Sequence, residues 1–211
     1  MLIQGQVGPI ALNQSISAGL QAPVRQGNLG DIIASELHGR YYETTYRRSQ
    51  LQAANQVPTG TSAALNLAYT GLILSNPIGS SVNLVLNKVG YSFGVAFPAA
   101  AAIGLMTGFN ASTNVSHTTS TSTRSSFIGL GAVGQGLVDV SATMPTAPTV
   151  HTLFDVGLTG AITVAPGGVS KIIDMEGSII LPPGAYVAIY TSTASGASSF
   201  MGSFAWEEVP S

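Results

Sequence analysis

The sequence has no cysteine, few charged residues and no block of charge of one sign. Zero cysteines among 211 residues exclude disulfides and cysteine-ligated zinc, and they leave the redox compartment open. Only 8% of the residues are charged, against about a quarter in an ordinary soluble domain. The charged side chains between Ser49 and Ser170 are Lys88, Arg124, Asp139 and Asp155. This composition favours a protein that packs against copies of itself or against a partner.

The sequence also lacks the signals of nucleic-acid binding, secretion and membrane insertion. The formal net charge is −2 and no basic block exists, so we expect no nucleic-acid partner. The N-terminus lacks a positive region followed by an apolar core, so we expect synthesis in the cytoplasm without a signal peptide. Residues 89–109 are uncharged over about the length of a bilayer helix, but Val89, Tyr91 and Phe93 alternate with glycine and serine. That period of two predicts a half-buried strand, and we expect no membrane partner.

Short apolar and β-branched runs, separated by Gly, Pro and Ser turns, predict an all-β sandwich or barrel. The expected strands are 41–47, 67–75, 82–97, 103–109, 150–158, 169–175, 178–181, 185–191 and 200–209. Residues 179–191 predict a hairpin that turns at Pro182-Pro183-Gly184. The best helix candidate, Ile32–Leu37, is too short to organise the fold.

Two domains are expected: an extended N-terminal arm at residues 1–35 and a β-sandwich domain at residues 36–211. The arm is rich in Gln, Gly, Asn and Ser and has no sustained period. The Ser/Thr tract at 112–126 lacks apolar alternation, which favours a long exposed loop over a strand.

No motif carries a strong catalytic, metal or cofactor signal. Gly129-x-Gly131-x-x-Gly134 matches a dinucleotide fingerprint, but the following residues hold glycine, β-branched residues and proline, so we expect a loop. Asp174 and Glu176 would share one strand face, and Glu207 and Glu208 add two more acids; we interpret all four as solvent or interface carboxylates.

The three histidines, His38, His117 and His151, are scattered singly. A Ser–His–Asp triad can be imagined in any serine-rich chain, so we expect no catalytic residue, no metal, no cofactor and no enzyme activity.

Aromatic and basic residues gather before residue 49. Such a cluster suits either a nucleic-acid platform or an oligomer interface, where Tyr and Arg are enriched, and we favour the interface. The expected interface residues are Arg40, Tyr41, Tyr42, Tyr46, Arg47 and Arg48, on an anchoring strand.

Three segments resemble a group of tailed-bacteriophage structural proteins. They are HGRYYETTYR, GLILSNPIGSSVNLVLNKVGYSF, and the ending GSIILPPGAYVAIYTSTA followed by GSFAWEEVP. The resemblance covers most of residues 36–209 and contains no catalytic signature. It implies a jelly-roll-like β-sandwich that decorates or cements a capsid in the virion. The implied partners are the chain itself, as a homo-oligomer such as a trimer, and the major capsid protein.

Two alternative functions stay open on the sequence. A head-fibre or tail-associated adhesin would bind its host through the 112–126 tract and the glycine loop at 129–136, which are typical of loop tips. A polysaccharide-cleaving enzyme would use Asp174 and Glu176.

Overall fold

The computed structural model describes residues 5–6, 24–25, 39–129, 134–157, 169–196 and 199–211. The chain divides into two compact units, Met1–Arg40 and Tyr41–Ser211. In the first unit, β1 (Gly5–Gln6) pairs in parallel with β2 (Val24–Arg25). The rest of the expected arm, and the helix candidate Ile32–Leu37, lie outside the described residues.

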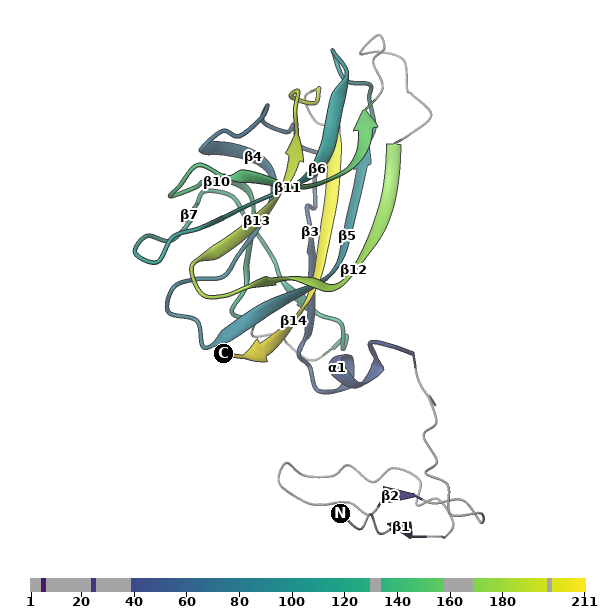
Figure 1. The fold of residues 1–211 in the computed structure, drawn as a ribbon. Helices are drawn as coiled ribbons and strands as arrows, with labels where there is room; N and C mark the ends of the chain where they lie inside the picture. Colours follow the sequence, from purple (N-terminus) through teal and green to yellow (C-terminus); the bar gives the residue numbers. More distant parts are fainter. Residues whose placement is uncertain (1–4, 7–23, 26–38, 130–133, 158–168, 197–198) are drawn as a thin grey trace. The chain divides into compact units, whose positions relative to one another are not determined.

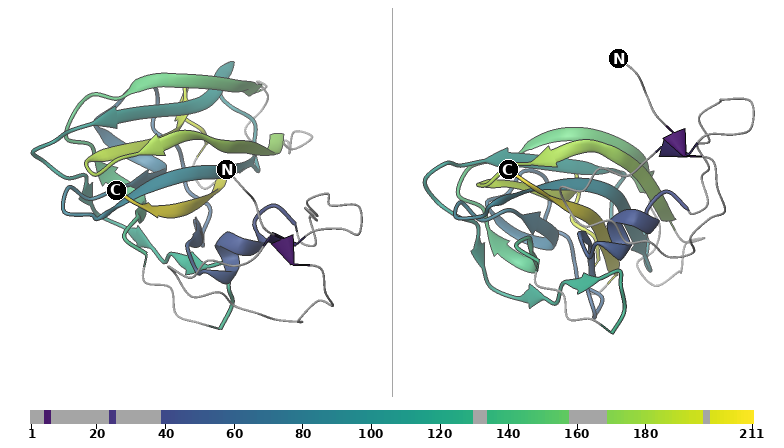
Figure 2. Two further views of the ribbon diagram at one scale, coloured as in Figure 1. Left: turned by 60° about the horizontal axis from the view of Figure 1, so that its bottom comes forward. Right: turned by 90° about the horizontal axis from the view of Figure 1, so that it is seen from below.

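The second unit is an all-β sandwich of two antiparallel sheets (Figure 1, Figure 2), as the strand pattern predicted. The seven-stranded sheet runs β11-β6-β13-β4-β10-β7, with β8 also pairing β10, and the five-stranded sheet runs β12-β5-β14-β3-β9. The strands are β3 (Gln50–Ala54), β4 (Ala68–Ser75), β5 (Val82–Phe93), β6 (Ala101–Phe109), β7 (Ser116–His117), β8 (Ser120–Thr121), β9 (Arg124–Ser125), β10 (Leu137–Thr143), β11 (Thr149–Gly157), β12 (Val169–Leu181), β13 (Ala185–Thr191) and β14 (Phe200–Pro210).

The connectivity is that of a jelly roll. Among the eight strands β3, β4, β5, β6, β11, β12, β13 and β14, which remain when β7 to β10 are set aside, the chain changes sheet at every step except from β6 to β11. The chain segment between β6 and β11 contains the strands β7, β8, β9 and β10. Strands that are neighbours along the chain therefore seldom pair with each other.

The main core lies between the sheets. On β5, Val89, Tyr91 and Phe93 are almost fully buried, which confirms the predicted alternation, although the strand ends at Phe93. Trp206 on β14 is fully buried in the same cluster. A second apolar cluster, which includes Val115, lies on the outer face of the seven-stranded sheet, the face that points away from the five-stranded sheet, over β4, β6, β10 and β13. β13 is consequently buried on both faces.

The predicted hairpin at 179–191 is wrong. The turn forms, with Gly184 at φ 89° and the Ala185 amide donating to the Pro182 carbonyl at 3.0 Å. However, β12 pairs with β5 in one sheet, whereas β13 pairs with β4 and β6 in the other. The turn therefore carries the chain from sheet to sheet. The segments expected as separate strands at 169–175 and 178–181 form one strand, β12, interrupted by a bulge.

The expected strand at 41–47 is also wrong, because α1 (Tyr42–Tyr46) forms there. The Thr44 hydroxyl donates to the Tyr41 carbonyl, so a residue typical of strands is accommodated in the helical turn. Tyr42 and Tyr46, four residues apart, stack with ring centroids 6.0 Å apart. Arg48, with φ 64°, adopts the left-handed conformation that ends many helices.

The Ser/Thr tract at 112–126 is not simply a long exposed loop. It contributes β7, β8 and β9, each two residues long, and these join both sheets. Val115 and Ser125 are buried, and they anchor the tract at both ends. Its remaining residues are mostly exposed.

Candidate functional site

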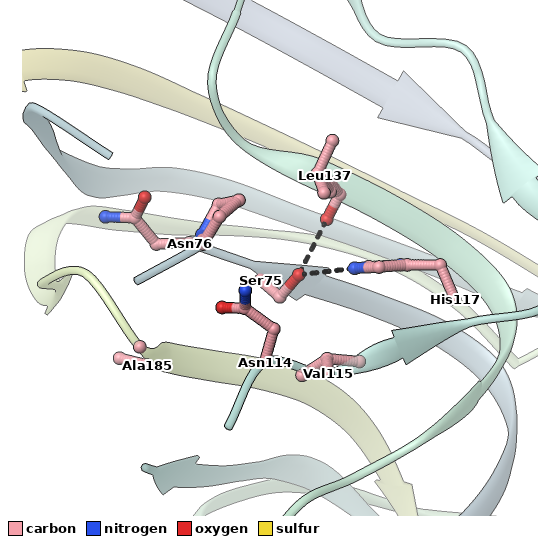
Figure 3. A pocket seen from close by; sticks show the side chains of 9 residues that line it. Ser75, Asn76, Asn114, Val115, His117, Leu137 and Ala185 are labelled. Carbon is pink, nitrogen blue, oxygen red and sulfur yellow. Dashed lines mark hydrogen bonds between the residues drawn. The ribbon is translucent and has the colours of Figure 1, made fainter. Parts of the chain in front are cut away.

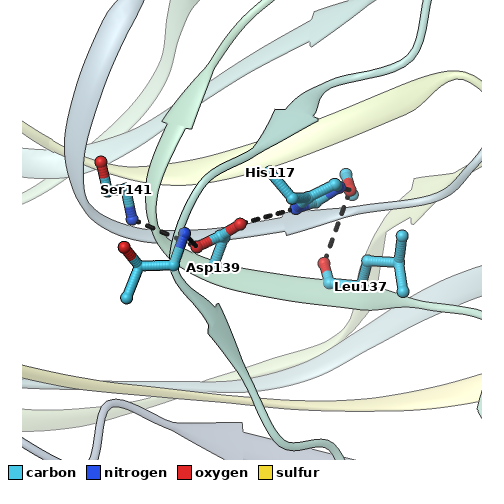
Figure 4. Close-up of polar contacts among 6 residues, drawn as sticks. His117, Leu137, Asp139 and Ser141 are labelled. Carbon is cyan, nitrogen blue, oxygen red and sulfur yellow. Dashed lines mark hydrogen bonds and ion pairs between the residues drawn. The ribbon is translucent and has the colours of Figure 1, made fainter.

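Three neighbouring strands bring a serine, a histidine and an aspartate together on the outer face of the seven-stranded sheet. Figure 3 shows Ser75 with His117, and Figure 4 shows His117 with Asp139. Ser75 is the last residue of β4, His117 lies on β7 and Asp139 lies on β10. Asp139 is opposite Ile73 of β4 in the register, so it shares the face of the second apolar cluster. It is fully buried there.

The three side chains form a continuous hydrogen-bonded chain. His117 Nδ1 lies 3.0 Å from Asp139 Oδ2, and His117 Nε2 lies 3.1 Å from Ser75 Oγ. The other Asp139 oxygen accepts from the backbone amides of Thr119 at 2.8 Å and Ser141 at 3.3 Å. Since Asp139 acts throughout as an acceptor, we assign the neutral imidazole's proton to Nδ1. Nε2 is then an acceptor for the Ser75 hydroxyl at 3.1 Å, and the Leu137 carbonyl, at 3.5 Å, is the second acceptor within reach of the same proton.

A pocket of about 160 Å³ opens beside Ser75 (Figure 3). Its walls are largely apolar and include Pro77, Val115 and Leu137. Asn114 supplies a polar group to the same pocket, and its Oδ1 accepts from the Ile78 amide at 2.8 Å. That bond fixes the side chain so that Nδ2 is its remaining donor. Asn114 and Ser75 line the same pocket, and Figure 3 shows the Asn114 amide turned toward the Ser75 side of it.

Ser75, His117 and Asp139 stand in the order nucleophile, base and orienting carboxylate, the arrangement that activates serine in acyl transfer. The sequence did not predict this site, because a Ser–His–Asp triad can be imagined in any serine-rich chain. One signal was present: Asp139 is the only charged residue in the apolar strand LVDVSAT. A carboxylate in a buried strand requires donors around it, and here His117 is one of them.

The predicted interface residues do not lie on a strand. Tyr42 and Tyr46 are exposed on α1, and the Tyr46 ring also lies 6.4 Å from that of Phe127. Tyr41 donates its hydroxyl to Asp174 at 2.9 Å, and Lys88 Nζ lies over its ring. Arg47 and Arg48 are exposed at the end of α1. Arg40 belongs to the first unit of the chain.

The glycine motif lies between β9 and β10, and residues 130–133 are outside the described part. Beyond Gly134 the chain enters a strand, β10, where a dinucleotide site requires a helix. Glu208 accepts from the backbone amides of Gln135 and Gly136 at 2.8 and 2.9 Å. This carboxylate therefore ties the loop to β14.

The other acids are also engaged in local contacts. The bulge in β12 places Glu176 at φ 51°, so the strict alternation expected for Asp174 and Glu176 is broken. At the same edge of the sandwich, Lys171 lies 2.8 Å from Asp155. This hydrogen bond lowers the pKa of the Asp155 carboxyl. Burial, together with the Asp155 charge, raises the pKa of the Tyr91 hydroxyl, which donates to Asp155 at 3.1 Å.

His151 lies on β11 and is exposed, and His38 falls outside the described residues. Within the ranges that the structure describes, no three His, Asp or Glu side chains converge as a metal site. In the same ranges, none of the helices combines the length and the apolar character needed to cross a bilayer. Comparison of the chain with protein-family models, curated proteins and solved structures finds no match.

Proposed function

We propose that the chain is a structural virion protein that forms a homo-oligomer and decorates or cements a bacteriophage capsid by bridging its subunits. The observation that carries the proposal is an uncharged apolar strip on the outer face of the seven-stranded sheet. Val150, Leu153 and Val156 of β11 are 40%, 57% and 60% exposed. They stand opposite Met106, Gly104 and Ala102 of β6 in the register, so the three side chains share that outer face.

The strip favours burial against a protein surface. A half-solvated antiparallel sheet ordinarily carries polar residues on its outer face. Burying the exposed parts of Val150, Leu153 and Val156 would contribute about 2–5 kcal/mol per subunit. On β6 and β13, the next two strands, the outer-face side chains Met106, Tyr186 and Ala188 are already buried in the second apolar cluster, so the exposed strip is that of β11. A second copy of this chain fits the strip, because two uncharged faces meet without like-charge repulsion or buried unpaired charge.

The capsid contact is assigned to the tyrosines and arginines around α1. Tyr42 and Tyr46 are 45% and 52% exposed. Ile128 is 89% exposed, and it follows Phe127, whose ring lies near that of Tyr46. Exposed tyrosine beside arginine is the composition enriched in protein interfaces. The proposal therefore separates two surfaces: the β11 strip for self-association, and the α1 surface for binding the shell.

Reconstitution on particles tests this proposal. Capsids lacking the protein are incubated with the full chain, and genome release on heating is followed with a DNA-binding dye. Wild-type protein is expected to raise the release temperature. Leu153→Lys should lose this effect by losing the oligomer, and Tyr46→Ser with Arg47→Ser should lose it by losing capsid binding. Val57→Lys, at a 68% exposed loop residue, is the control and should behave as wild type. Unchanged release with wild-type protein would overturn cementing, and failure to bind particles would overturn decoration.

A further inference from the structure

The Ser75–His117–Asp139 chain lies outside the surfaces assigned to assembly. Its geometry meets the first requirements of a nucleophilic site: the nucleophile is within hydrogen-bond reach of its base, and the base is within reach of its orienting group. The orienting carboxylate is held by two backbone amides in addition to His117. His117 therefore cannot turn away without leaving a fully buried carboxylate short of a donor.

The serine borders a space that can hold an acyl group. Ser75 lines the 160 Å³ pocket together with Pro77, Val115 and Leu137. This volume is below the range of about 300–1,000 Å³ for drug-sized ligands, so it suits a short chain. The apolar walls match the hydrocarbon part of such a group.

The pocket also contains a donor for a developing oxyanion. Asn114 Oδ1 is fixed on the Ile78 amide, which leaves Nδ2 as the donor on the Ser75 side of the pocket. A side-chain amide in this role contributes about 100- to 1,000-fold to kcat where it has been removed from serine enzymes.

We propose that this site is a serine acyl-transfer centre that hydrolyses esters of short carboxylic acids. Ser75 Oγ attacks the ester carbonyl carbon while His117 Nε2 takes the hydroxyl proton. Asn114 Nδ2 donates to the oxyanion of the tetrahedral intermediate. The carbon–oxygen ester bond breaks, and the alkoxide leaves with the proton from His117, giving acyl-Ser75. Water then attacks the acyl group, its proton passes through His117 to Ser75, and the carboxylic acid is released. Asp139 is a positioning residue that holds the imidazole.

A fluorophosphonate probe tests the nucleophile directly. The full-length folded protein is incubated with the probe, and the modified residue is identified by peptide mass spectrometry. The expected result is one adduct, on Ser75, formed by native but not by urea-unfolded protein. Ser75→Ala should abolish it, whereas Ser112→Ala, at an exposed loop serine, should not. Absence of an adduct on Ser75 in the native protein, or equal labelling after unfolding, would overturn the proposal.

Ester hydrolysis tests the pocket and the oxyanion donor. p-Nitrophenyl acetate is expected to react faster than the octanoate, and Ser75→Ala should remove the activity. Asn114→Asp keeps the oxygen that accepts from Ile78 but removes the donor, so kcat should fall at least 100-fold with little change in KM. Circular dichroism confirms that each variant is folded. Equal rates for wild type and Ser75→Ala would contradict the assignment, and equal rates for wild type and Asn114→Asp would remove Asn114 from it.

Discussion

Replacing Asn76 should separate the two sheets at one corner. Asn76 follows β4 of the seven-stranded sheet and is 1% exposed. Its Nδ2 donates to the carbonyls of Leu181 at 2.9 Å and Val82 at 2.8 Å, which belong to β12 and β5 of the five-stranded sheet. One amide therefore joins both sheets at the point where the chain crosses between them.

The size of the effect follows from the two carbonyls that lose their donor. Each lost bond costs about 0.5–1.5 kcal/mol, and up to about 3 kcal/mol if the carbonyl stays buried and unpaired. Asn76 Oδ1 is itself buried without a hydrogen-bond partner among the described residues, so its removal offsets part of this loss. We expect Asn76→Ala to lower the free energy of unfolding by about 2–4 kcal/mol. Asn76→Asp, which keeps the shape but turns an acceptor toward both carbonyls, should cost more.

Urea unfolding followed by the fluorescence of the single tryptophan, Trp206, measures this loss, because that side chain is fully buried in the core. With a slope of about 2 kcal/mol/M, the midpoint should move by about 1–2 M at unchanged slope. Asn83→Ala on β5, at a partly exposed asparagine, is the matched control and should stay within about 0.5 kcal/mol of wild type. If Asn76→Ala also stays within 0.5 kcal/mol, the amide is not what joins the sheets.

Two further predictions concern β6 and the sandwich edge. Gly104→Ala should lower Tm by at least about 5 °C in calorimetry, because a Cβ there collides with the Thr152 carbonyl of the paired strand; Gly79→Ala, in open space, should change Tm little. Asp155 has its pKa lowered by Lys171, so its contribution to stability is present above the ordinary carboxyl pKa of 3.8 and is lost as the pH falls through the lowered value. Both partners are partly solvent-exposed, so the effect is small. In urea titrations, the free energy of unfolding should fall more between pH 6 and pH 2 in wild type than in Asp155→Asn, by up to about 1 kcal/mol. An equal fall in both proteins would refute the link.

The strands could be predicted from the sequence more completely than their partners. The alternation from Val89 to Phe93 reports which face of a strand is buried, and that inference is confirmed. The runs at 179–181 and 185–191 are also strands, but their pattern does not encode which strand lies beside them. A Pro-Pro-Gly turn is compatible with a hairpin or with a crossing between sheets. At this turn the chain crosses between sheets, and there the Leu181 carbonyl accepts a hydrogen bond from Asn76, a residue far away in the sequence.

The candidate site could not be predicted because it depends on strand order. Ser75, His117 and Asp139 are far apart along the chain, and they meet only because β4, β10 and β7 are neighbours in the sheet. The helix α1 was missed for a different reason. Aromatic residues and threonine favour strands on average, but Tyr42 and Tyr46 are spaced four apart, and that spacing indicates one face of a helix.

The most direct test of the assembly is the mass of the full-length protein in solution, measured by light scattering after gel filtration across micromolar concentrations. A homo-oligomer is predicted, with a mass several times that of one chain. Leu153→Lys places a charge in the β11 strip and should dissociate it, while Val57→Lys should leave it intact. A wild-type protein that is monomeric at every concentration, or an oligomer that Leu153→Lys does not weaken, would contradict self-association through this face.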